Sequence, residues 1–114
     1  MKKHITVEVI AQYAIASKDT STIHLDVNAS RKAGFNRPIA HGMYIMGLAQ
    51  SLYLSEHPTL WITTYKMKFQ KPLVVGTVAI FNFERVEDRV ELAVTTETGD
   101  KIAAGSFLVK ELQR

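Results

Sequence analysis

Two stretches of the sequence carry side chains of the kinds that perform acid–base chemistry. Residues 19–24 place the Asp19 carboxylate and the His24 imidazole five residues apart in a polar, turn-rich segment. Imidazole titrates near neutral pH, so it can either accept or donate a proton there. Residues 34–43 form the second stretch, a loop that leads through His41 and Gly42 into a predicted helix. Either stretch alone is a weak signal, whereas the two together indicate a functional site.

Asp19 and His24 also have plainer interpretations. An isolated aspartate in such a segment is commonly a turn or cap residue, and an isolated histidine is commonly a hydrogen-bonded, partly buried side chain. A metal site formed by Asp19, His24, Asp26 and His41 is disfavoured, because the sequence has no H-E-x-x-H or comparable ligand spacing. We therefore expect no metal ion.

Two helices are predicted to position these stretches. The first is capped by Thr6 and runs to about residue 16. Its expected buried stripe comprises Val7, Ile10, Ala11, Ala14 and Ile15. Residues 17–28 are expected to form a loop, followed by a helical turn over 28–32 that Gly34 ends. The second long helix, over residues 41–55, is apolar on nearly all sides, which is typical of a buried helix. Within it, Gly47 suggests the close approach of another backbone.

The remaining sequence predicts four strands, over residues 60–71, 76–85, 89–97 and 101–110. In the first strand, strict alternation assigns one face to Trp61, Thr63, Tyr65, Met67 and Phe69. A tight turn over residues 98–100 joins the last two strands. These elements predict a single α+β domain over residues 1–114, in which an antiparallel meander curves around the apolar helix. Because four strands leave the helix partly uncovered and two edges exposed, we expect a homodimer.

Composition narrows the possible partners and compartments. The chain has 114 residues, of which 46% are hydrophobic and 22% charged, as in an ordinary globular domain. No apolar run reaches the roughly 18 residues that span a bilayer, so no membrane partner is expected. The net charge of +3 is spread along the chain, which disfavours nucleic acid and suits small molecules with phosphates. Glu8 and Gln12 interrupt the apolar stretch after Lys2 and Lys3, and cysteine is absent, so a cytoplasmic protein is expected.

In the two stretches over residues 19–24 and 34–43, the sequence resembles the MaoC-like hydratases of the hot-dog fold, also called (R)-specific enoyl-CoA hydratases. Their signature D-x-N-P-[LIV]-H is matched by Asp19, Ile23 and His24, and their pattern G-F-x-x-P-I-x-H-G-M by residues 34–43. The resemblance extends from about residue 6 to residue 111. This sequence departs from the family at Ser21 and Thr22, which replace Asn-Pro, and it is expected to lack the strand that usually precedes the first helix.

The resemblance implies roles for particular residues. Asp19 and His24 are expected to hold and activate one water, while the Gly42 backbone N–H, in the first helical turn, stabilises an oxyanion. The implied substrate is an acyl-CoA or acyl-carrier-protein thioester, and no cofactor is implied. The expected substrate-binding residues are Phe35, Ile39, Ala40, His41 and Met43. His41 is also expected to hold its loop through a side-chain hydrogen bond.

The implied activity is that of a lyase, which hydrates trans-2-enoyl-CoA to (R)-3-hydroxyacyl-CoA or catalyses the reverse dehydration. Two alternatives remain open. One is an acyl-CoA thioesterase on the same fold, and the other is a non-catalytic module that binds acyl thioesters.

Overall fold

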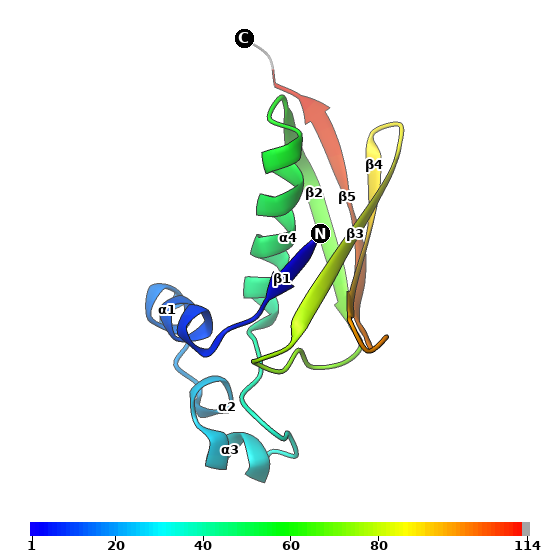
Figure 1. Ribbon diagram of the computed structural model, residues 1–114. Helices are drawn as coiled ribbons and strands as arrows, with labels where there is room; N and C mark the ends of the chain where they lie inside the picture. Colours follow the sequence, from blue (N-terminus) through cyan, green and yellow to red (C-terminus); the bar gives the residue numbers. More distant parts are fainter. Residues whose placement is uncertain (113–114) are drawn as a thin grey trace.

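A five-stranded antiparallel sheet packs against one long helix (Figure 1). The structure, a computed structural model, describes residues 1–112. In chain order the elements are β1 (Lys2–His4), α1 (Val7–Ser17), α2 (Thr22–Leu25), α3 (Val27–Lys32), α4 (Gly42–Glu56), β2 (Leu60–Phe69), β3 (Val78–Val86), β4 (Arg89–Thr96) and β5 (Lys101–Glu111). Three short helices, α1 to α3, gather near the start of α4 (Figure 1). The predicted α+β architecture, a sheet curved around a central helix, is confirmed.

Helices α1 and α4 begin and end close to the predicted residues. The Thr6 hydroxyl accepts a hydrogen bond from the Val9 N–H at 3.1 Å and so caps α1. Lys18 ends α1 in the left-handed conformation, with φ of 62°. α4 starts immediately after His41 and ends before the His57-Pro58 pair. Residues 19–41 are therefore bounded by two helices, α1 and α4, whose ends lie close to the predicted positions.

The N-terminal region differs from the prediction. A strand does precede the first helix: β1 pairs antiparallel with β3, with Lys2 opposite Ile80 and His4 opposite Val78. Its three residues are all exposed, so no alternating hydrophobic pattern marked it. The expected loop over residues 17–28 likewise contains the short helix α2.

The strand order also differs, because the four predicted strands are not one meander. The order in the sheet is β1-β3-β4-β5-β2, so β2 pairs with β5 and not with β3. Residues 70–77 carry the chain away from β2 to the far side of the sheet. On the way Val74 forms an isolated bridge with Ile39, and this bridge brings the connection against the loop before α4.

A β-bulge makes the strict alternation predicted for β2 wrong. The register of β2 against β5 shifts between Ile62 and Thr64, and such a shift reverses which residues face the core. Trp61 is therefore 48% exposed, whereas the Tyr65 hydroxyl reaches α4 and donates to the Met46 carbonyl at 2.9 Å. Phe69, at the end of the strand, lies on the same face as Tyr65.

The core lies between the sheet and one side only of α4. The buried residues of α4 are Ile45, Ala49, Leu52 and Tyr53, while Met43 is 67% exposed. Within residues 1–112 nothing lies within 4 Å of a Cβ built on Gly47, so the expected close backbone approach is absent from this chain. The stripe predicted on α1 is also only half correct, because Ile10 and Ala14 are buried but Val7 and Ile15 are exposed. Over the same residues, no helix combines the length and apolar character needed to cross a bilayer.

Replacing Tyr65 with Phe tests how β2 is fixed to α4. Because the Met46 carbonyl loses a donor, we expect Tyr65→Phe to lower the free energy of unfolding at pH 8 by about 1 kcal/mol. Burial raises the pKa of Tyr65 to about 12, above its value in an unfolded chain. The stabilisation is therefore complete below pH 10 and lost as the pH rises toward 12, so the wild-type advantage narrows across that range.

Urea unfolding at several pH values measures this difference, and Tyr53→Phe is the matched control. The Tyr53 hydroxyl is buried and has no hydrogen-bond partner among the described residues, so its removal is expected to be neutral or stabilising. Equal losses in the two variants would contradict the assignment.

Candidate active site

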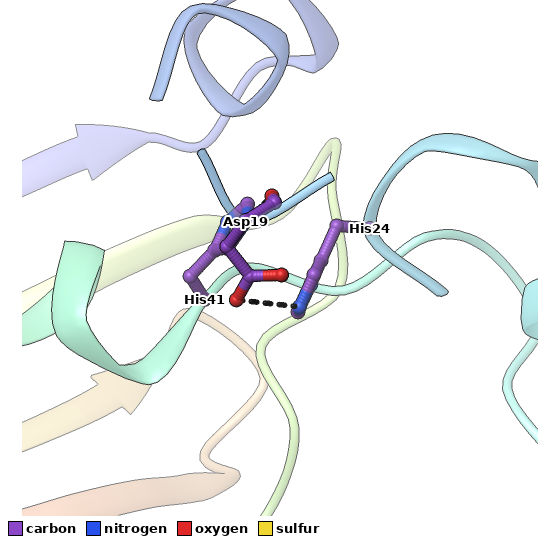
Figure 2. Close-up of side chains that lie close together, drawn as sticks. All are labelled: Asp19, His24 and His41. Atoms are coloured by element: carbon purple, nitrogen blue, oxygen red, sulfur yellow. Dashed lines mark hydrogen bonds and ion pairs between the residues drawn. The ribbon is translucent and has the colours of Figure 1, made fainter. Parts of the chain in front are cut away.

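Three side chains from separate parts of the chain meet near the start of α4 (Figure 2). Asp19 lies on the loop after α1, where its N–H donates to the Ser17 hydroxyl at 3.3 Å. His24 lies on α2, and His41 is the last residue before α4. The sequence predicted all three as site residues, and the structure brings them together.

One backbone contact sets the tautomer of the neutral His24 ring. Its Nδ1 lies 2.7 Å from the Ile39 carbonyl oxygen, which accepts only, so Nδ1 carries the hydrogen. In the neutral ring Nε2 is then an acceptor, and this nitrogen lies 4.0 Å from Asp19 Oδ2 (Figure 2). That distance is too long for a direct hydrogen bond. A water oxygen can lie within hydrogen-bond distance of both atoms.

His41 supports both partners of this pair. Its Nε2–H donates to the Asp19 backbone carbonyl at 2.9 Å, so the loop is held by the side-chain hydrogen bond expected of His41. Its ring is stacked on the His24 ring, with centroids 3.7 Å apart and planes 20° apart. The Tyr13 ring packs edge-on against His41 at 4.8 Å. His41 is 3% exposed and thus a buried support for Asp19 and His24.

Asp19 is held as a carboxylate by its own loop. The Ser21 hydroxyl donates to Asp19 Oδ1 at 2.8 Å, and the Ser21 N–H donates to the same oxygen at 3.3 Å. These hydrogen bonds lower the pKa of Asp19 below its ordinary value. They also leave Oδ2 directed at His24. Ser21, one of the two departures from the family signature, therefore supplies two contacts to the Asp19 carboxylate.

A cleft of about 560 Å³ joins these groups to the start of α4. Its lining comprises Tyr13, Ser17, Asp19, His24, His41, Gly42, Met43 and Phe69. Gly42 is the first residue of α4, where backbone N–H groups have no intrahelical partner and the helix dipole favours negative charge. The cleft is therefore lined by a carboxylate, an imidazole and the first residue of a helix.

The residues predicted to bind substrate are divided between three places. His41 and Met43 line the cleft, and Ala40 lines an adjoining cavity of about 280 Å³. Phe35 and Ile39 line neither cavity. The Ile39 carbonyl instead orients His24, and the Phe35 N–H donates to the Ser30 carbonyl at 2.9 Å. Contact of Phe35 and Ile39 with substrate stays a prediction.

Sequence reasoning missed three residues that line the cleft, namely Tyr13, Ser17 and Phe69. Tyr13 and Ser17 lie one turn apart at the end of α1, three residues after the buried Ile10 and Ala14 respectively. A correct choice of the buried face of α1 would have found them. Phe69 ends a strand distant in sequence, and no local pattern indicates that its ring reaches Gly42 at the start of α4.

Asp19, His24 and His41 each offer one ligand atom, and these atoms lie within 4.8 Å of one another. The hydrogen bonds already described occupy His24 Nδ1 and His41 Nε2. A metal ion would therefore have to use His24 Nε2 and the buried His41 Nδ1, together with the carboxylate.

Comparison with known proteins identifies the family. The family model described as MaoC like domain matches residues 1–105, so the chain belongs to the MaoC-like dehydratase family. The structure superimposes on the (R)-hydratase from A. caviae involved in PHA biosynthesis with a TM-score of 0.82 and 24% identity, covering 98% of this chain and 92% of that one. It also superimposes on R-hydratase PhaJ1 from Pseudomonas aeruginosa with a TM-score of 0.78 and 22% identity, covering 100% and 84%. The hot-dog fold expected from the resemblance is confirmed.

Two curated relatives are dehydratases. The chain is 28% identical over 119 residues to 3-hydroxybutyryl-CoA dehydratase from Methylorubrum extorquens, covering 96% of this chain and 75% of that protein. It is 29% identical over 69 residues to the mitochondrial 3-hydroxyacyl-[acyl-carrier-protein] dehydratase of Arabidopsis thaliana. That match covers 60% of this chain and 42% of the Arabidopsis protein.

The link between Ser21 and Asp19 can be tested in the free protein. Because the Ser21 hydroxyl makes the shorter of two hydrogen bonds to the carboxylate, we expect Ser21→Ala to raise the pKa of Asp19 toward its ordinary value. Carboxyl ¹³C NMR titration measures this pKa directly. Thr20→Ala, an exposed neighbour, is the control and should leave the titration unchanged. An unaltered Asp19 titration in Ser21→Ala would show that the hydroxyl has no such effect.

Proposed function

We propose that this chain hydrates trans-2-enoyl thioesters to (R)-3-hydroxyacyl thioesters and catalyses the reverse dehydration, without a cofactor. The observation that carries the proposal is the shared cleft. Asp19 Oδ2 and His24 Nε2 are 4.0 Å apart, and Gly42, the first residue of α4, lines the same cleft. Membership of the MaoC-like family and the names of the two dehydratase relatives support the same reaction.

The chemistry needs a base, a proton carrier and a site for negative charge. In the hydration direction, a water held by Asp19 Oδ2 and His24 Nε2 forms a bond from its oxygen to C3 of the substrate. His24 Nε2 takes a proton from this water as the π electrons of the C2–C3 double bond move onto the thioester oxygen. His24 then gives the proton to C2, and the carbonyl is restored. One water is added and no other proton is gained or lost.

Two fixed groups stabilise the charges that develop on this path. Asp19 stays ionised next to the imidazolium that His24 becomes, which lowers the energy of the charged ring. The Gly42 N–H donates to the thioester oxygen when that oxygen carries negative charge. One such donor typically contributes about 10²- to 10³-fold in rate. Dehydration follows the same steps in reverse.

Variants of the two side chains test the proposal. We expect Asp19→Asn and His24→Ala each to reduce kcat for trans-2-butenoyl-CoA by at least about 100-fold, because the first removes the charge that stabilises the imidazolium and the second removes the base. Absorbance of the conjugated thioester measures hydration, and chiral analysis identifies the product. Asp88→Asn and His4→Ala, both exposed and outside the cleft, are matched controls that should keep activity. Full activity in either cleft variant would refute its role, and loss of wild-type activity with EDTA would indicate a metal.

The same assay separates the alternatives. A thioesterase would release free CoA thiol, which a thiol-reactive dye detects. A non-catalytic binding module would show thermal stabilisation by acyl-CoA without turnover.

We also propose that the chain assembles as a homodimer. The side of α4 that carries Met43 and Gly47 is exposed, and β1 pairs with only the first residues of β3, over Val78 to Ile80. A second copy would cover this helix face or the rest of the β3 edge. Light scattering should therefore give twice the chain mass of 12.8 kDa. A monomer mass would contradict the proposal, and so would association only with a different chain.

A further inference from the structure

Two cavities meet at the first turn of α4. One is the cleft that contains Asp19 and His24, and the other is the smaller cavity of about 280 Å³. The smaller cavity is lined by Ala40, Gly42, Ile45, Phe69, Gln70, Lys71, Pro72 and Leu73. Among residues 1–112, only Gly42 and Phe69 line both, so these two residues form the boundary between them.

The Phe69 ring lies directly over Gly42. A Cβ built on Gly42 would lie 3.1 Å from the tip of the ring and within 3.6 Å of two further ring atoms. The backbone after Phe69 is fixed, because the N–H groups of Gln70 and Lys71 both donate to the Ile102 carbonyl. The side chain itself is 43% exposed. The ring is therefore a partition held by its own backbone and by contact with α4.

The smaller cavity is chemically suited to a hydrocarbon chain. Most of its lining is apolar, including Ala40, Ile45, Pro72 and Leu73, whereas its polar side chains belong to Gln70 and Lys71. The arm of CoA carries two amides, which are costly to bury without hydrogen-bond partners. An acyl tail has no such requirement and gains free energy from each buried methylene.

We propose that Phe69 determines chain length in the reaction proposed above, on which this inference rests. A thioester whose carbonyl oxygen lies at the Gly42 N–H has its C2 and C3 near Asp19 and His24. Its tail beyond C3 must pass the Phe69 ring to reach the smaller cavity from the cleft. The ring thus restricts the wild-type protein to short acyl groups, and its removal joins the two cavities and admits longer ones.

The experiment compares a short and a long acyl group in Phe69→Ala. Calorimetry measures the affinities of butyryl-CoA, decanoyl-CoA and CoA alone, and the hydration assay gives kcat/KM for trans-2-butenoyl-CoA and trans-2-decenoyl-CoA. We expect both long-to-short ratios to rise at least tenfold over wild type, since one buried methylene is equivalent to roughly fourfold. The affinity for CoA alone should not change.

Two further variants serve as controls for the effect of Phe69→Ala. Trp61→Ala removes a similarly exposed aromatic ring at the other end of β2, which lines neither cavity, and should leave both ratios unchanged. Phe69→Leu removes the flat ring but keeps an apolar side chain. It should shift both ratios in the same direction by a smaller factor, and it decides the question if the alanine variant does not fold.

The outcomes distinguish this inference from the proposed reaction. Unchanged ratios in a protein that hydrates butenoyl-CoA would overturn the role of Phe69 and leave the reaction intact. An equal gain in affinity for CoA alone would also overturn it, because the cavity would then hold the CoA arm. A shifted affinity ratio without hydration in any variant would support the role of Phe69 and reject the reaction.

Discussion

The site depends on one buried ring, that of His41. This residue ends the loop before α4, holds the Asp19 carbonyl through Nε2–H and is stacked on His24. Asp19 and His24 belong to a segment that has only one short helix of its own. Their relative position is therefore set by the two contacts of His41 and by the hydrogen bond from His24 Nδ1 to the Ile39 carbonyl. Because His41 also directly precedes Gly42, the same residue connects Asp19 and His24 to the start of α4.

The departures from the family signature fall on this supporting structure and not on Asp19 or His24 themselves. Ser21 still contacts the Asp19 carboxylate, through both its hydroxyl and its N–H. Thr22 is the first residue of α2, the helical position at which proline loses no intrahelical hydrogen bond and fixes φ in advance. With threonine there, less of the loop conformation is fixed by covalent geometry. More of it therefore rests on the contacts of Ser21 and His41.

The sequence predicted those parts of the fold and site that depend on residues close together in the chain. The Thr6 cap, the helix after His41 and the two motifs all follow from neighbouring residues, and the structure has each of them in place. The errors concern long-range pairing. Nothing in the three exposed residues of β1 indicates a partner 74 to 78 positions away, and nothing in β2 shows that it pairs with β5 and not β3.

The β2 bulge had the same kind of consequence for the site. One extra residue near Thr63 reverses the two faces of the strand, exposing Trp61 and directing Tyr65 toward α4. Strict alternation is a sound local rule, but it cannot register an irregularity that is fixed by the neighbouring strand. The position of Phe69 in the cleft is therefore a tertiary property.

Space for a side chain is limited at Gly42, the first residue of α4. Two demands meet at this residue, since in the proposed reaction its N–H binds a substrate oxygen, and its Cα accepts the Phe69 ring. A methyl group would leave the N–H in place but would lie 3.1 Å from the ring, so the ring would have to move. Since φ at Gly42 is not in the left-handed region, backbone strain does not require glycine here. The requirement is space, and the ring that occupies this space is the one that separates the two cavities.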